Sequence, residues 1–348
     1  MNKTEYQRDS NMELLRIVTM FLVMIFHIDF ISLNGTNHID PSNNPISSFI
    51  RITLALASFT CVDIFVLLSG WYGIKFKTSK LLAFIFQILF FSILSYTCFA
   101  IFGKTNNKLF LHIFFLDAYW FIPTYLALYF FSPILNIYVD KCTKANLQRT
   151  LILLFIAQIC YGWISQQERG YNEGCSPISF IILYLTARYL KLYPSSLTKM
   201  KKRWDALIYI SVCLIVAIPV FYGEAYNIDI ITNTIFKFTS PFTIISSVYL
   251  VLFFSKIKLK SHWINWIAIS SFAAFLVHCF PLFNQFVYHD IISFLYLHYS
   301  GITLVILIML YICGIYSFSI LIDKVRIFLY QRIKESRLLI YMKQQIKK

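Results

Sequence analysis

The sequence predicts an all-α, polytopic integral membrane protein with about ten transmembrane helices and with both termini in the cytoplasm. Of the 348 residues, 58% are hydrophobic and only 14% are charged, whereas a soluble protein needs more charge to cover its surface. Apolar runs of about 17–25 residues recur along the whole chain, and this length crosses the ~30 Å hydrocarbon core of a bilayer.

The apolar runs must be helices, because backbone polar groups that face lipid need partners within their own segment. The first run, which begins at Leu14, has no small-residue cleavage site, so we interpret it as a true span rather than a signal peptide. The predicted spans are residues 14–33, 50–72, 80–102, 117–139, 148–164, 176–193, 206–222, 237–255, 264–287 and 301–322.

The distribution of basic residues sets the orientation. With the N-terminus inside, most of the 31 Lys and Arg residues fall in segments that face the cytoplasm, as the positive-inside rule requires. The net charge of +15 is therefore a property of the loops on one side of a membrane, and it does not indicate a nucleic-acid partner. The basic residues assigned to the outside are Arg51, Lys104, Lys108, Arg169 and Lys237.

Two regions follow from this pattern. Residues 1–323 are expected to form one transmembrane domain, and residues 324–348 a basic, partly amphipathic cytoplasmic tail. Such a tail is attracted to the anionic lipids of the inner leaflet, so membrane lipids are expected partners. No C-x-x-C or similar metal-binding spacing occurs, and no metal is expected.

Arg16 and His27 stand out among the few ionisable residues inside the spans. They are eleven residues apart, which places them on one face of a helix about 16 Å apart along its axis. Arg16 is alternatively an anchor that snorkels to the interface, and His27 alternatively a helix–helix hydrogen-bonding residue. Together they suit a long phosphorylated cofactor, because arginine binds phosphate and neutral imidazole takes a proton from a hydroxyl.

His278 and Asp63 are the other candidates. His278 lies in the ninth span at about the predicted depth of His27, so the two residues are expected to line one cavity, and Pro281 is expected to kink the helix beyond it. The alternative is a packing histidine. Asp63 lies in the second span, where a bare carboxylate is costly. Pairing with either Arg16 or His27 is left open, as is a purely structural ion pair.

Four stretches, in order along the chain, resemble the membrane acyltransferase-3 superfamily, whose members O-acylate bacterial surface sugars. The family pattern Arg-x(10)-His matches the first stretch, and the whole chain is covered by the resemblance. The stretches are residues 11–27 with Arg16 and His27, residues 62–76 with Asp63, residues 119–136 with Trp120, and residues 270–282 with His278.

The resemblance implies an O-acyltransferase of the bacterial plasma (inner) membrane, in the short form used beside polysaccharide biosynthesis enzymes. Its donor is acetyl-CoA or another acyl-CoA, its acceptor a hydroxyl of a cell-surface polysaccharide or of a lipid-linked precursor, and no metal takes part. His27 and Asp63 are expected to be catalytic, and Arg16 to bind the acyl-CoA. His278 and Trp120 are expected at the substrate site. The acyl group, the acceptor sugar and a homo-oligomeric state stay open.

Two other classes of protein fit parts of this pattern. A transporter or flippase for a lipid-linked sugar also has many helices with buried charge, but carriers often show matching broken helices in internal repeats, and no such pair is evident. A membrane scaffold does not explain why Arg16 and His27 share one helix face.

Overall fold

The computed structural model describes residues 9–33, 39–105, 107–165, 167, 170–196 and 198–336, and these residues are helices joined by turns and short loops, without a strand. The chain divides into two compact units. Unit 1 comprises Met1–Phe76 and Tyr119–Ala268, and unit 2 comprises Lys77–Ala118 and Ile269–Lys348.

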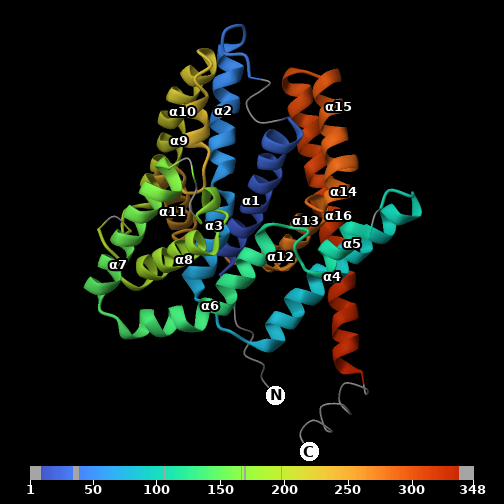
Figure 1. The fold of residues 1–348 in the computed structure, drawn as a ribbon, viewed down its shortest axis with the longest axis horizontal. Helices are drawn as coiled ribbons and strands as arrows, with labels where there is room; N and C mark the ends of the chain where they lie inside the picture. Colours follow the sequence, from blue (N-terminus) through green and yellow to red (C-terminus); the bar gives the residue numbers. More distant parts are fainter. Residues whose placement is uncertain are drawn as a thin grey trace, which may run out of the picture. The chain divides into compact units, whose positions relative to one another are not determined.

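Unit 1 holds the N-terminal helix and most of the chain's middle part (Figure 1). Prolines occupy the first helical turn at Pro45, Pro177 and Pro241, where the missing N–H is not needed. Its elements are α1 (Ser10–His27), η1 (Ile28–Ser32), α2 (Pro45–Phe59), α3 (Cys61–Tyr72), α6 (Phe121–Lys141), α7 (Lys144–Ala157), η3 (Gln158–Ile164), η4 (Asn172–Gly174), α8 (Pro177–Leu192), α9 (Lys202–Ala225), α10 (Asp229–Ile235), α11 (Pro241–Ser255) and α12 (His262–Ala268).

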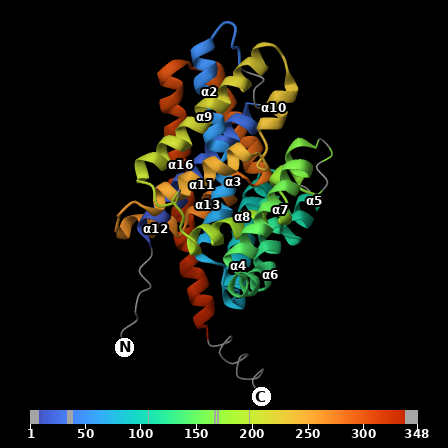
Figure 2. The same cartoon turned by 90° about the vertical axis from the view of Figure 1, so that its left-hand side faces the viewer.

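The core of unit 1 consists of α3 and α11, which are apolar on most sides. Helix α11 packs on α9 and α3, α3 packs on α8, and α2 packs on α9. Figure 2 shows α9, α11 and α3 next to one another. A helix that is hydrophobic all round is a buried helix, and α3 accordingly buries Ile64, Val66, Leu67 and Leu68. Helix α1 completes the core by packing on α2, α3, α11 and α12.

Several helix ends of unit 1 that we assigned to the cytoplasmic side contact one another. The Asn11 side chain donates to the carbonyl of Phe254 (2.9 Å), and the Tyr72 hydroxyl donates to Asp9 (3.1 Å). The start of α1 therefore meets the ends of α3 and α11. The alternation of directions predicted for these three helices agrees with these contacts.

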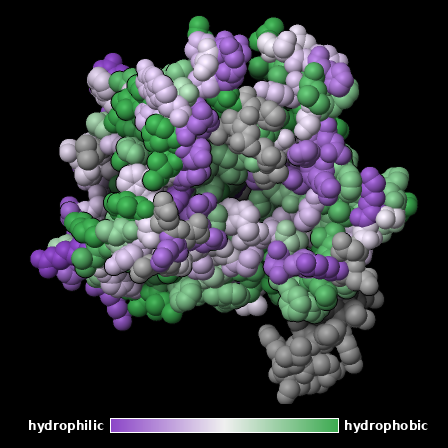
Figure 3. All heavy atoms as spheres, turned by 45° about the horizontal axis from the view of Figure 1, so that its top comes forward, coloured by the Kyte–Doolittle hydropathy of each residue, from purple (hydrophilic) through white to green (hydrophobic). Residues whose placement is uncertain are grey.

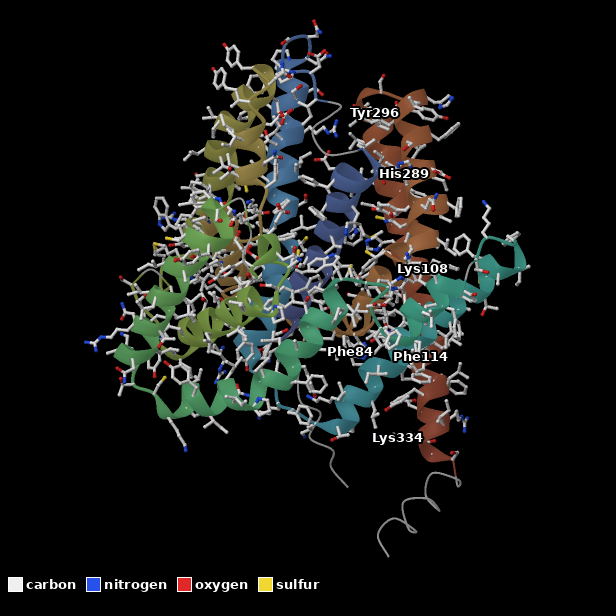
Figure 4. All side chains as sticks on the ribbon, in the orientation of Figure 1. Phe84, Lys108, Phe114, His289, Tyr296 and Lys334 are labelled. Atoms are coloured by element: carbon white, nitrogen blue, oxygen red, sulfur yellow. The ribbon has the colours of Figure 1, made fainter. Side chains whose placement is uncertain are left out.

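Unit 2 contains α4 (Thr78–Ile101), α5 (Asn107–Phe114), α13 (Ser271–His278), α14 (Pro281–Phe283), η5 (Asn284–His289), α15 (Asp290–His298) and α16 (Gly301–Glu335). Helix α13 packs between α4 and α16. Figure 4 shows His289 and Tyr296 toward one end of this unit and Lys334, near the end of α16, toward the other. The last helix thus runs the length of the unit.

Among the described residues, six helices are long and apolar enough to cross a membrane, or seven if one bent pair counts as a span. Large apolar side chains are exposed on these helices, and Figure 3 shows broad hydrophobic areas on the visible face. The chain is therefore a multi-pass membrane protein. The six helical stretches are Pro45–Tyr72, Thr78–Ile101, Phe121–Lys141, Lys144–Ile164, Lys202–Ala225 and Gly301–Glu335.

The count of ten spans is not confirmed, although every predicted span coincides with a helical segment. Helices α8 and α11 have 16 and 15 residues, which is roughly 23–24 Å at 1.5 Å per residue and less than a straight crossing needs. The ninth predicted span is broken, because His262–His278 and Pro281–His298 meet at 72°. The predicted kink at Pro281 is therefore confirmed. Proline has no backbone N–H to donate to the preceding helical turn.

The predicted boundary at Asp323 falls inside α16, which continues to Glu335. Asp323 is fully buried and accepts two hydrogen bonds from Arg326, at 2.6 and 3.2 Å. Gln87 of α4 donates to the same carboxylate (3.0 Å), so this part of α16 is held against α4. The second part of the predicted tail, residues 337–348, lies outside the described residues, and its contact with lipid stays a prediction.

Candidate functional site

Helix α1 carries Arg16 and His27 on one uninterrupted helix, as the sequence predicts. Arg16 lies in a polar environment, because its guanidinium donates to Glu13 at 2.6 Å and interacts electrostatically with Tyr72 and Tyr125. The Arg16 side chain keeps 31% of its surface exposed, against 10% for that of Glu13. The arginine at this end of α1 is therefore partnered and still accessible.

His27 is the last residue of α1, and it is buried. The chain changes to π-helical geometry directly after it, over Ile28–Ser32, a distortion that is frequent at functional sites. Asp29, in this π-helical turn, accepts from Arg51 of α2 at 2.8 Å. This ion pair ties the end of α1 to α2 and so restrains the backbone that positions His27.

Asp63 lies in the first turn of α3, where α2 and α3 are separated at Thr60. The residue is 1% exposed, and neither of its carboxylate oxygens has a hydrogen-bond or ion-pair partner among the described residues. Of the pairings left open for Asp63, neither the one with Arg16 nor the one with His27 is formed, and no structural ion pair replaces them among the described residues. The N-terminal end of α3 partly offsets the cost of a charge at this position, because the helix dipole favours an anion there.

Trp120 lies directly before α6 and is 41% exposed. Its ring stacks on Phe238 at 6.3 Å between ring centroids, and Phe238 stacks on Phe59 at 4.5 Å. Phe59 contacts Phe26 edge to face at 5.3 Å, and His27 follows Phe26 in the chain. A continuous row of aromatic rings therefore connects Trp120 to the neighbour of His27.

Gly174 makes the position of Phe238 feasible. It has a φ of +102°, and an added Cβ would overlap the Phe238 side chain. We therefore expect Gly174→Ala to lower the free energy of unfolding by roughly 2–4 kcal/mol, through backbone strain and overpacking. Gly170→Ala is the matched control, since Gly170 has a φ of +87° but no atom within 4 Å of the added Cβ. Equal losses of thermal stability in detergent for both variants would show that Phe238 is not held in this way.

In unit 2, His278 ends α13 and is fully buried. Its Nδ1 lies 2.5 Å from the carbonyl oxygen of Ala274, and since a carbonyl only accepts, Nδ1 carries the proton. Nε2 is then the basic nitrogen of a neutral ring, and it lies 3.3 Å from the Cys279 sulfur. The Tyr288 ring packs at 5.3 Å from the imidazole, so His278 has a fixed orientation.

The helix break beside His278 leaves backbone groups without helical partners. Asn284 donates to the carbonyl of His278 at 3.2 Å, which satisfies one of them. His278 and His27 belong to different units, whose mutual arrangement is not determined. The cavity that the two histidines are expected to share stays a prediction.

Two cationic residues near these groups were not singled out as site residues from the sequence. Arg188 of α8 packs against the end of α3, where a Cβ added at Gly73 would lie 3.1 Å from Nη1. Its Nε is buried and has no partner among the described residues. Lys237 is 7% exposed, and its ammonium group has a long 3.5 Å contact with the carbonyl of Trp163.

Sequence reasoning placed both cations in loops or at helix ends, where basic residues are common. The available signal was the position of Lys237 between Phe236 and Phe238, because a lysine flanked by large apolar residues is a candidate for burial. Arg188 gave no signal that distinguishes it from the other basic residues of the same segment.

The fold defines a helical membrane protein that buries several ionisable side chains, and such residues are candidates for function. The model of the acyltransferase-3 family, described as an acyltransferase domain, matches residues 9–324. The chain therefore belongs to this family and is a membrane acyltransferase. No curated protein and no solved structure shows a significant match.

Proposed function

We propose that this protein transfers an acetyl or another short acyl group from cytoplasmic acyl-CoA to a hydroxyl of a cell-surface polysaccharide or of its lipid-linked precursor. The observation that carries the proposal is the single helix α1, with an accessible arginine near one end and a buried histidine at the other. The two residues are about 16 Å apart along the helix, a span that suits a long donor with a charged head and a reactive tail.

The donor head is bound at the Arg16 end. Arg16 is accessible, and the Arg188 guanidinium and the Lys191 ammonium lie beside Gly73 and Trp71 at the end of α3, with Lys191 at 4.7 Å from the Trp71 ring. Tyr72 of the same helix end interacts electrostatically with Arg16. Guanidinium groups bind phosphate oxygens in pairs, so these cations suit the phosphates of CoA.

The reactive end lies at His27. The imidazole takes the proton of the acceptor hydroxyl, and the hydroxyl oxygen attacks the thioester carbonyl. A new C–O bond forms, the C–S bond breaks, and the CoA thiolate leaves and receives a proton from the imidazolium. Asp63 is a buried acceptor, without a partner among the described residues, for a polar group of the substrate.

Trp120 and His278 are the two candidates, each by itself, for contacts with the acceptor. Trp120 is exposed and is fixed by stacking on Phe238, and an aromatic face of this kind packs against the apolar face of a sugar ring. His278 has a basic Nε2, because its Nδ1 is engaged by Ala274. We propose that His278 binds an acceptor hydroxyl.

The proposal includes ten spans, cytoplasmic termini and a location in the bacterial plasma membrane. The positive-inside distribution supports the orientation. Reporter fusions after residues 104, 170 and 336 test the topology. The first two should report an external location and the last a cytoplasmic one.

Acyl transfer by purified protein in lipid vesicles tests the function directly. The protein is inserted into vesicles that contain glycan lipids from the producing bacterium, with its cytoplasmic side facing outward, and acetyl-CoA is added outside. These vesicles should yield acetylated glycan, which mass spectrometry detects. Movement of the glycan lipid between leaflets without any acylation would favour the flippase instead.

Arg16 substitution provides a separate test of the donor site. Losing a charge-assisted hydrogen bond weakens binding by about ten- to a hundredfold, so Arg16→Lys should raise the Kd of acetyl-CoA by about tenfold and Arg16→Ala by about a hundredfold. Isothermal titration calorimetry measures both. Arg149→Ala is the control, because Arg149 is exposed on α7. Unchanged affinity in both Arg16 variants would reassign Arg16 to membrane anchoring.

A further inference from the structure

The helix break at the end of α13 places a thiol beside a histidine. Cys279 directly follows α13, in the short connection to α14 within unit 2 (Figure 1). Its sulfur lies 3.3 Å from Nε2 of His278. Nε2 is the basic nitrogen of that ring, because Nδ1 donates to the carbonyl of Ala274. The thiol of Cys279 therefore donates its hydrogen to the imidazole.

Both members of this pair have a fixed position. The Tyr288 ring packs 5.3 Å from the imidazole, and Ala274 holds Nδ1. The backbone N–H of Cys279 donates to the carbonyl of Phe275 at 3.0 Å, which keeps Cys279 on the last turn of α13 although the helical axis bends by 72° beyond it. A nucleophile within hydrogen-bond reach of a base that a third group orients is the arrangement of enzymes that form covalent intermediates.

Exposure differs between the two partners and between the cysteines. His278 is fully buried, whereas Cys279 is partly exposed, so a reagent reaches the sulfur while the base stays shielded from water. Cys98, Cys160 and Cys313 are more exposed, but none of them has a histidine within hydrogen-bond distance among the described residues. Exposure alone gives an ordinary thiol, and an adjacent base makes a thiol a better nucleophile. Cys279 combines access with an oriented base.

The pair suits the exchange of one thioester for another. His278 takes the thiol proton at Nε2, and the Cys279 sulfur attacks the carbonyl carbon of an acyl-CoA. A C–S bond to Cys279 forms, the C–S bond to CoA breaks, and the CoA thiolate receives the proton from the imidazolium. The exchange needs no further reactant. It is readily reversed, because the bond that forms and the bond that breaks are of the same kind.

We infer that Cys279 is a self-acylation site, which takes the acyl group from acyl-CoA with His278 as the base. The inference rests on the proposed function for the identity of the donor, and it goes beyond the direct transfer to a glycan. The acyl group on Cys279 returns to CoA by the same steps in reverse. Cys279 is therefore a reversible store of acyl groups that needs no glycan acceptor.

Incubation with radiolabelled acetyl-CoA in the absence of glycan tests the inference. The full-length protein in detergent is quenched in acid and digested with pepsin, and the labelled peptides are mapped by mass spectrometry. We expect the label on the peptide that contains Cys279. Neutral hydroxylamine, which cleaves thioesters, should release it. Cys279→Ser should lose this hydroxylamine-sensitive label, because a hydroxyl forms an ester instead of a thioester.

Exchange of the acetyl group between acetyl-CoA and radiolabelled CoA gives a second readout. Wild-type protein should catalyse this exchange without any glycan, and Cys279→Ser should abolish it. Cys313→Ser is the matched control and should change neither readout, because Cys313 is exposed on α16 of the same unit. His278→Gln should slow both reactions by about 10²–10⁴-fold, the usual contribution of a general base. Melting temperatures in detergent show that each variant is folded, and Cys279→Ser tests the inference even if His278→Gln does not fold.

Equal labelling of Cys98, Cys279 and Cys313 would overturn the inference, because it would show only chemical acylation of accessible thiols. Exchange that Cys279→Ser does not diminish would also overturn it. The proposed function fails separately. If wild-type protein acylates Cys279 but never a glycan, self-acylation stands and glycan acylation falls. If it acylates glycan but neither the thioester nor the exchange appears, glycan acylation stands and the Cys279 site falls.

Discussion

His27→Ala is expected to lower the rate of acyl transfer by about 10²–10⁴-fold, the usual contribution of a general base. Donor affinity should change little, because Arg16 and its neighbours lie at the other end of α1. The measurement is the single-turnover rate with saturating acetyl-CoA, together with the Kd of acetyl-CoA for the variant.

His27→Gln separates chemistry from packing. Glutamine keeps a hydrogen-bonding group on this buried helix end but cannot take up a proton. If His27 is the general base, His27→Gln should be as slow as His27→Ala. If His27 only packs, His27→Gln should recover most of the wild-type rate. His298→Ala is the control for loss of an imidazole, because His298 is exposed at the end of α15. A near-normal rate of acyl transfer by a folded His27→Ala protein would show that His27 is not the general base.

The helical elements were predictable because the bilayer imposes one rule on every segment. Each apolar run had to become a helix. Pro281 favoured a break, although Pro133 and Pro219 lie inside α6 and α9 without ending them. The number of crossings was not predictable in the same way. Hydropathy does not reveal that α8 and α11 have only 16 and 15 residues, because helix boundaries read from one sequence are uncertain by about two to four residues.

The candidate site was predictable where it depends on position along one helix. The spacing of Arg16 and His27 needed only the helical repeat, and the structure keeps both on α1. Contacts between distant segments were not predictable from one sequence. The pairing of Arg16 with Glu13 is local, but the stacking of Trp120 on Phe238 depends on how α6 meets the loop before α11.

Asp63 shows the same limit for charge pairing. The sequence indicated a costly buried carboxylate, and a nearby cation was the physically reasonable partner. In the structure Arg16 forms an ion pair with Glu13, and Asp63 has no partner among the described residues. A pairing rule based on predicted depth alone does not show which of two acidic residues, Glu13 or Asp63, contacts Arg16.

Asp63→Asn is expected to raise or preserve stability while lowering acyl transfer about a hundredfold or more. An unpaired carboxylate in a low-dielectric core costs folding free energy, and an amide of similar shape removes that cost. Asp205→Asn is the matched control, because Asp205 is equally buried but accepts from Lys256 at 2.6 Å. Removing one partner of such a pair costs about 3–5 kcal/mol, so Asp205→Asn should lower the melting temperature in detergent, whereas Asp63→Asn should raise it or leave it unchanged.

The joint readout makes the two roles of Asp63 separable. If Asp63→Asn stabilises the fold and slows acyl transfer, the Asp63 carboxylate is present for its chemistry. Natural proteins tolerate local destabilisation at functional sites. If Asp63→Asn melts as early as Asp205→Asn, the carboxylate has a partner in the native protein and its role is structural. If the variant is stable and fully active, Asp63 takes no part in the reaction, and His27 acts without a carboxylate from α3.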